Sequence, residues 1–103
     1  MFALGDKRWP GLSKLIEEAG EVVQVSGKLI AIGGEANHWD GSDLRVRLTE
    51  ELADLQAAID MVVYLNRLNK AVLTARREAK RALFVQWHIE QGEDDTDELE
   101  GKT

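Results

Sequence analysis

Residues 12–32 read LSKLIEEAGEVVQVSGKLIAI, and this stretch decides the fold of the chain. Apolar side chains recur every three or four positions along it, at Leu12, Leu15, Ile16, Ala19, Val22, Val23, Leu29 and Ile30. That spacing matches the period of an α-helix, so we expect a helix over about 12–32. Ser13 is a candidate for its N-cap, and Gly33-Gly34 supplies a stop.

Two later stretches have the same periodicity and predict an all-α fold with three main helices. A loop over 33–42 precedes the second helix, which Ser42 or Asp43 can cap and which runs to about Asn66. A turn follows, and the third helix ends at Gly92. A domain this small buries a modest core. We therefore expect a helical bundle whose four-helix-like core is completed by dimerisation.

Composition narrows the class of protein. The chain has 103 residues, a net charge of −6 and no cysteine, which excludes disulfides and thiolate metal sites. The negative charge argues against a nucleic-acid partner, and no apolar run is long enough to span a membrane. We expect a cytoplasmic protein with one domain over 1–92. The acidic segment 93–103 is expected to be a disordered tail.

Acidic residues gather at two places, Glu17-Glu18-x-x-Glu21 and Glu50-Glu51-x-x-Asp54. Carboxylates three residues apart project from one face of a helix. Two such pairs facing each other would form a cage of hard oxygen ligands, which suits Mg²⁺ or Mn²⁺ better than Zn²⁺. The sequence therefore predicts a divalent metal site between the first two helices.

Helical-wheel positions, at about 100° per residue, divide these carboxylates into two groups. Four flank the apolar stripes of their helices: Glu18, Glu21, Glu51 and Asp54. Small or apolar neighbours such as Val25 and Ala58 share their strips, which indicates partial burial and hence a need for pairing or a metal. Glu17 and Glu50 point away. The ordinary alternative is a solvated acidic surface, which is common on helices.

The segments LSKLIEEAGEVVQ (12–24) and LTEELADLQAAID (48–60) resemble the all-α nucleoside triphosphate pyrophosphohydrolases of the MazG type. The mark of that family is E-x-x-E, a spacer, then E-x-x-D, which maps onto Glu18, Glu21, Glu51 and Asp54. The resemblance covers about residues 9–90. The spacer is long for the family because of the 33–42 loop, so the contacts to the base and the substrate choice are not readable.

The resemblance implies cleavage of a nucleoside triphosphate (NTP or dNTP) between its α and β phosphates, giving the monophosphate and pyrophosphate. It also implies Mg²⁺ held by the four carboxylates, and a homodimer or dimer of dimers. For substrate binding we expect Arg76, Lys80 and Lys14 to contact phosphates, and Trp9 and Trp39 to contact the base. The ordinary readings are a solvated basic face for the cations and hydrophobic capping of the bundle ends for the tryptophans.

Three other functions stay open at this stage. One is a non-catalytic helical interaction module whose acidic faces bind a basic partner. Another is a regulatory homologue that binds nucleotides without hydrolysing them, although all four expected ligands are present. The third is hydrolysis of a special substrate within the same class, such as phosphoribosyl-ATP or a dUTP- or dCTP-type nucleotide.

Overall fold

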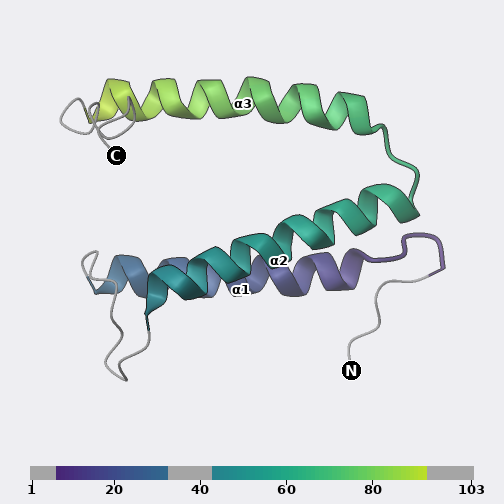
Figure 1. Ribbon diagram of the computed structural model, residues 1–103, viewed down its shortest axis with the longest axis horizontal. Coiled ribbons are helices and arrows are strands. Elements are labelled where there is room, and N and C mark those ends of the chain that lie inside the picture. Colours follow the sequence, from purple (N-terminus) through teal and green to yellow (C-terminus); the bar gives the residue numbers. More distant parts are fainter. Residues whose placement is uncertain (1–6, 33–42, 93–103) are drawn as a thin grey trace. The chain divides into compact units, whose positions relative to one another are not determined.

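A computed structural model describes residues 7–32 and 43–92, and in these ranges the chain is helical without strands. The helices are α1 (Leu12–Ala31), α2 (Leu44–Leu65) and α3 (Lys70–Gln91) (Figure 1). The prediction of an all-α fold with three main helices is confirmed. The chain divides into two compact units, Met1–Leu68 and Asn69–Thr103. The expected stop at Gly33-Gly34, the loop and the tail lie outside the described residues.

Local capping sets where the helices begin and end. The Asp43 carboxylate accepts hydrogen bonds from the backbone N–H groups of Arg45 and Val46, at 2.9 and 3.4 Å, and so caps α2 as expected. Asn69 caps α3 in the same way through the N–H of Val72, at 3.0 Å, and Gly92 follows its last residue.

The expectation that Ser13 caps α1 is wrong. The N-cap of α1 is Gly11, which has a left-handed φ of 93° and no capping side chain. Ser13 lies inside the first turn, and its buried hydroxyl oxygen has no hydrogen-bond partner among the described residues. The approach of the chain to α2 selects the start of α1, because Gly11 fits where a side chain would not.

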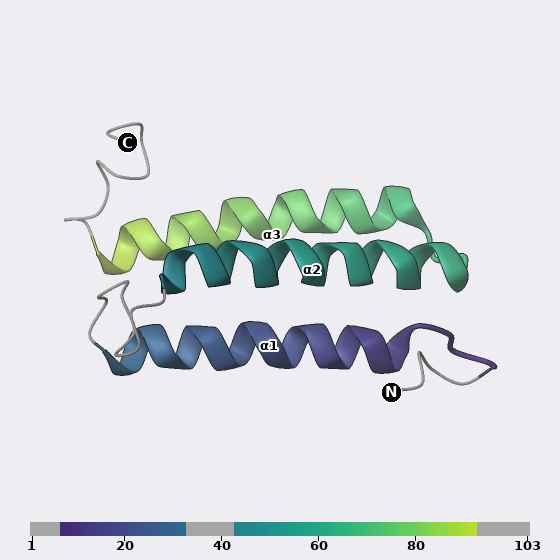
Figure 2. The same ribbon diagram turned by 60° about the horizontal axis from the view of Figure 1, so that its bottom comes forward.

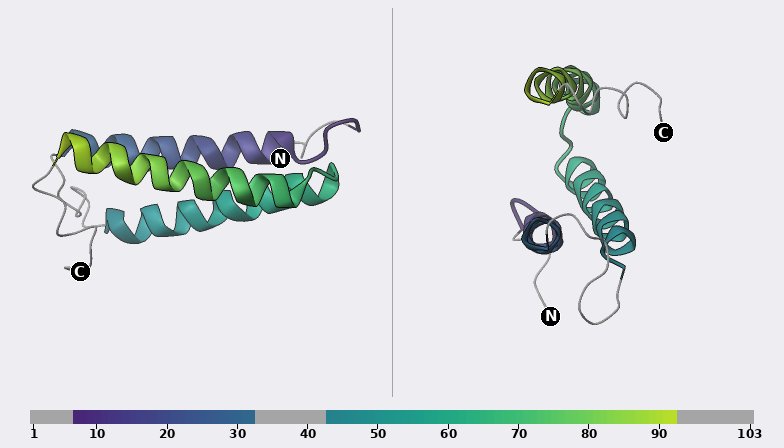
Figure 3. Two further views of the ribbon diagram at one scale, coloured as in Figure 1. Left: turned by 90° about the horizontal axis from the view of Figure 1, so that it is seen from above. Right: turned by 90° about the vertical axis from the view of Figure 1, so that its left-hand side faces the viewer.

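α1 and α2 run antiparallel and pack against each other in the first unit (Figure 2). In the right-hand view of Figure 3, α1 is seen nearly along its axis and α2 lies beside it. The buried apolar side chains of the described residues are few: Val25, Leu44, Ala58 and Val62. Glu18 is only 9% exposed and lies on the same side of α1 as Val25. The hydrophobic core of this unit is therefore small, and it includes one carboxylate.

The start of α1 is fastened to the end of α2. The Asn66 side-chain amide donates one hydrogen bond to the Pro10 carbonyl and one to the Val62 carbonyl, both at 2.9 Å. A Cβ placed on Gly11 would lie 3.1 Å from Val62 Cγ2 and 3.2 Å from Met61 Cε. This close approach fixes the register of the two helices and hence which residues face each other.

The face on which α1 packs differs from the expected one. The sequence predicts that the apolar stripe of α1 faces the core and that Glu18 and Val25 lie at its edge. In the structure Val25 is fully buried, whereas Ile16, Val23 and Ile30 of the stripe are 70, 71 and 81% exposed. The small side chain of Ala58 on α2 allows α1 to approach with its mixed strip, and Lys14 offsets the carboxylate charge there. Part of the apolar stripe of α1 is thus left on the surface.

α3 forms the second unit and, taken by itself, buries none of its residues. Several of its large apolar side chains are exposed, among them Val72, Phe84 and Trp87, and the rings of the last two lie 5.5 Å apart between centroids. Within the described ranges, no helix has the length and apolar character that crossing a membrane requires.

Candidate metal centre

Three of the four predicted ligands come together between α1 and α2. Glu18, Glu51 and Asp54 each offer a carboxylate oxygen, and these oxygens all lie within 4.8 Å of one another. Glu51 and Asp54 are three residues apart and share one face of α2. The antiparallel pairing places Glu18 of α1 opposite them, in the interface where Val25 and Ala58 are buried.

Glu21, the fourth predicted ligand, is half-buried one turn further along α1. It lies outside the group of three whose oxygens meet, but its charge reaches Glu51. Partial burial raises the pKa of Glu51 above its ordinary value, and the charges of Glu21, Asp54 and Glu18 raise it further, while Arg47 lowers it. The site therefore concentrates negative charge around Glu51.

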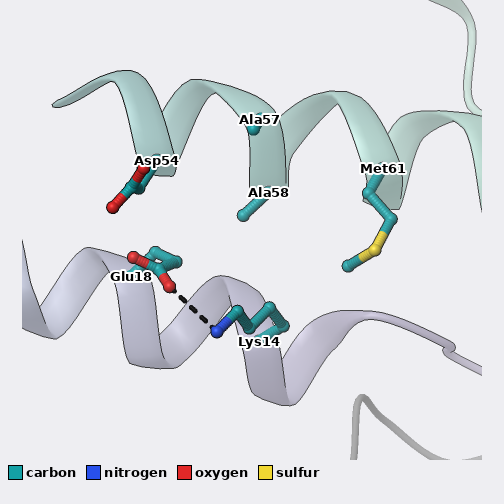
Figure 4. A pocket seen from close by; sticks show the side chains of 6 residues that line it. All are labelled: Lys14, Glu18, Asp54, Ala57, Ala58 and Met61. Atoms are coloured by element: carbon teal, nitrogen blue, oxygen red, sulfur yellow. Dashed lines mark ion pairs between the residues drawn. The ribbon is translucent and has the colours of Figure 1, made fainter. Parts of the chain in front are cut away.

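Lys14 supplies a positive charge at one end of the cluster. Its ammonium nitrogen lies 2.6 Å from a carboxylate oxygen of Glu17 and 3.0 Å from one of Glu18 (Figure 4). The hydrogen bonds to Glu17 and Glu18 raise the pKa of Lys14 well above its usual range. Glu17 was expected to point away from the core. It is half-buried here because it pairs with Lys14.

A pocket of about 380 Å³ opens beside the carboxylates. Polar groups of Lys14, Glu18 and Asp54 line one part of it, and Ala57, Ala58 and Met61 line the other (Figure 4). A charged end next to an apolar wall is an arrangement that suits a ligand with a polar and an apolar part.

Sequence reasoning named Lys14 only as a phosphate contact and missed its pairing with the acidic cluster. The signal was present, because Lys14 stands three and four residues before Glu17 and Glu18, the spacing at which helical side chains meet. That Met61 lines the pocket was not predicted either. No pattern in the sequence marked it, since apolar residues at this spacing are common in helices.

The other predicted substrate contacts are not among the residues that line this pocket. Trp9 precedes α1 and is 53% exposed. Arg76 is exposed and Lys80 half-buried on α3, in the second unit, so their role as phosphate contacts stays a prediction. Trp39 lies outside the described residues.

Comparison with known proteins adds no assignment to this geometry. No family model matches the chain, and neither a curated protein nor a solved structure matches it. The resemblance to MazG-type enzymes therefore rests on the two acidic motifs of the sequence.

Proposed function

We propose that this chain is a Mg²⁺-dependent nucleoside triphosphate pyrophosphohydrolase of the MazG type. The observation that supports it best is the meeting of Glu18, Glu51 and Asp54 within 4.8 Å, since these are three of the four positions that the family motif names. Glu18 is buried beside Lys14, and a metal ion would add positive charge where the three carboxylates meet.

The residues present fit Mg²⁺. Carboxylate oxygens are the hard ligands that this ion prefers. Glu18, Glu51 and Asp54 offer three of them within 4.8 Å of one another. Glu18, Glu51 and Asp54 would hold the ion, with Glu21 close enough to join them or to orient water. Mn²⁺ would be a possible substitute.

The reaction would add water across the bond between the α and β phosphates and release the nucleoside monophosphate and pyrophosphate. Bound Mg²⁺ would supply the positive charge that lets an acidic site accept a triphosphate. A carboxylate of the site that the ion does not saturate, such as Glu21, would take a proton from the attacking water. Lys14 would contact a phosphate oxygen, and Met61 with Ala57 and Ala58 would form the wall for an apolar part of the substrate.

A panel of ribo- and deoxynucleoside triphosphates tests this proposal. Each nucleotide is incubated with the protein in Mg²⁺ and, as a control, in excess chelator, and pyrophosphate release is measured. We expect release of pyrophosphate, not of orthophosphate, from at least one nucleotide and only with the metal. No release from any nucleotide by protein with intact helical circular dichroism would overturn the proposal and favour the non-catalytic interaction module.

The biological purpose that fits this chemistry is removal of damaged or surplus nucleotides from the pool. The family resemblance also supports a homodimer or dimer of dimers in which partner helices complete each site.

A further inference from the structure

The side chains that line the pocket between α1 and α2 follow a fixed order along it. Four of them stand on one face of α2, within about 100° of one another, and these are Asp54, Ala57, Ala58 and Met61. From Asp54 to Met61 the helix rises about 10 Å, at 1.5 Å per residue. Because α1 runs antiparallel, Glu18 lies across from Asp54, and Lys14 lies one turn nearer to Met61 (Figure 4). The pocket therefore has a charged end and an apolar end.

At the apolar end, the described residues that line the pocket offer no hydroxyl, amide or carboxylate group. Lys14 contributes to both ends. Its ammonium nitrogen turns toward the carboxylates and lies 3.0 Å from an oxygen of Glu18, while its aliphatic stem runs back along α1 (Figure 4). The rest of this end consists of the side chains of Ala57, Ala58 and Met61. A ligand group here would be held by shape and apolar contact rather than by hydrogen bonds to side chains.

The two neighbouring alanines make room at this end. Ala58 is 5% exposed, Ala57 is exposed and Met61 is half-buried. A methionine thioether is flexible and adapts to the group beside it. The pocket volume of about 380 Å³ lies in the range of sites that hold small organic molecules. The pocket thus has space for more than the group bound at its charged end.

The proposed function indicates which part of a substrate would occupy the apolar end. With the phosphates of a nucleotide at the charged end, the sugar comes next, because it is bonded to the α-phosphate. Ala58 stands four residues beyond Asp54, which is about 6 Å along α2. The sugar therefore fits against Ala57 and Ala58. A ribose would bring a 2′-hydroxyl to this position, whereas a 2′-deoxyribose would bring a methylene group.

We propose that the wall formed by Ala57, Ala58 and Met61 selects 2′-deoxyribonucleoside triphosphates over ribonucleoside triphosphates. This inference rests on the proposed function and names its substrate class. A 2′-hydroxyl placed on the wall gives up hydrogen bonds to water and finds no side-chain partner. The methylene group of a deoxyribose loses no hydrogen bond and gains apolar contact. Since an apolar site rejects an added hydroxyl only moderately, we expect a preference of roughly tenfold to 100-fold.

Pyrophosphate release from matched nucleotide pairs tests the selection. The two members of a pair differ at the 2′ position alone, as in ATP with dATP, GTP with dGTP, CTP with dCTP and UTP with dUTP. For every pair that is hydrolysed, we expect kcat/KM to be roughly tenfold or more higher for the deoxy member. Equal or faster hydrolysis of the ribo member would overturn this inference and leave the proposed function standing. Release from none of the eight nucleotides would overturn the proposed function instead.

Equilibrium binding tests the selection without turnover. The α,β-imido analogues of the same eight nucleotides carry nitrogen in the bridge that the reaction would break, and each is titrated into the protein with Mg²⁺ in a calorimeter. We expect the dissociation constant of the deoxy member to be roughly tenfold lower than that of the ribo member. Equal dissociation constants within every pair, or binding of no analogue, would overturn the inference whether or not the protein is an enzyme.

A matched pair of serine variants tests the position of the sugar. Ala57→Ser supplies the missing hydrogen-bond partner at an exposed part of the wall, so the deoxy preference should fall roughly threefold or more. Ala53→Ser makes the same change at an exposed position of α2 that does not line the pocket, and should leave the preference unchanged. Circular dichroism verifies the helical content of both variants. A deoxy preference that Ala57→Ser lowers no more than Ala53→Ser would show that the sugar does not lie on this wall.

Discussion

The ammonium nitrogen of Lys14 lies 3.0 Å from a carboxylate oxygen of Glu18, on the side of α1 that packs against α2. Glu18 is at the same time one of the three carboxylates that approach one another across the interface. One carboxylate is thus shared between a cation built into the protein and the proposed metal. Lys14 and Mg²⁺ would compete for Glu18, because both are attracted to the same oxygens.

Replacing Lys14 by Met should therefore strengthen Mg²⁺ binding and weaken substrate binding. The built-in ammonium no longer competes for Glu18, so we expect Mg²⁺ affinity to rise on the order of fivefold, the range of a partly exposed ion pair. The KM for the nucleotide should rise, since the proposed phosphate contact of Lys14 is lost. Titration calorimetry measures the first effect and pyrophosphate release the second. Lys14→Arg is the control, and equal Mg²⁺ affinity in Lys14→Met and wild type would contradict the competition.

Neighbouring carboxylates on α2 provide a matched pair for the metal site. Glu51→Gln removes a carboxylate of the cluster, whereas Glu50→Gln makes the same chemical change one residue away, at an exposed position outside the cluster. We expect Glu51→Gln to lose more than roughly 100-fold in kcat/KM, because ligand loss exceeds the effect of losing a supporting contact. Glu50→Gln should stay within about twofold of wild type. Full activity of Glu51→Gln would show that the ligands are wrongly assigned.

The pH dependence of stability without metal should report Glu51. Its pKa in the folded protein is raised above the ordinary 4.5. The folded state therefore binds this proton more tightly, so its stabilising contribution is complete below about pH 4.5 and is lost as pH rises through the folded-state pKa. Relative to wild type, Glu51→Gln should gain in Tm between pH 4.5 and 7 in chelator. A Tm difference that stays constant over this range would show that the carboxylate is unperturbed.

The sequence predicts the helices well because their spacing and caps are local signals. Helices α2 and α3 end at Leu65 and Gln91, and the residues that follow, Asn66 and Gly92, mark these ends in the sequence. The pairs Glu18–Glu21 and Glu51–Asp54 are predicted by the helical period of three to four residues. Which face of α1 meets α2 is not a local property. It depends on the close approach at Gly11 and on the small side chain of Ala58, so the exposed Ile16 and Val23 could not be anticipated.

The same reasoning limits what the sequence says about the site. Motif spacing selects Glu18, Glu21, Glu51 and Asp54, and the structure brings all of these except Glu21 together. The roles of Glu21 and Lys14 depend on how α1 and α2 pack, and the spacing of residues along the sequence does not predict this packing. Arg76 and Lys80 have the right charge, but charge alone does not assign a residue to a site on another helix.

Gly11 should tolerate no side chain. Its φ of 93° costs an L-residue about 1–2 kcal/mol, and an added Cβ would press on Val62 and Met61 at 3.1 and 3.2 Å. We expect Gly11→Ala to lower the free energy of unfolding by at least this strain. Gly92→Ala is the control, since φ there is −141°. Urea denaturation measures both, and a Gly11→Ala variant as stable as Gly92→Ala would mean that α1 does not begin as described.

Asn66 should matter because its amide joins two elements far apart in the sequence. Asn66→Ala removes the hydrogen bonds to the Pro10 and Val62 carbonyls and should cost about 1–3 kcal/mol of unfolding free energy, at 0.5–1.5 for each bond. Asn66→Asp should cost more, since a carboxylate only accepts hydrogen bonds and would face two carbonyl oxygens. Thr49→Ala is the control, because it removes an exposed bond within α2, to the Arg45 carbonyl at 2.9 Å, and should change stability by less than about 0.5 kcal/mol. If Asn66→Asp proved as stable as Asn66→Ala, the amide would not bridge the two carbonyls in solution.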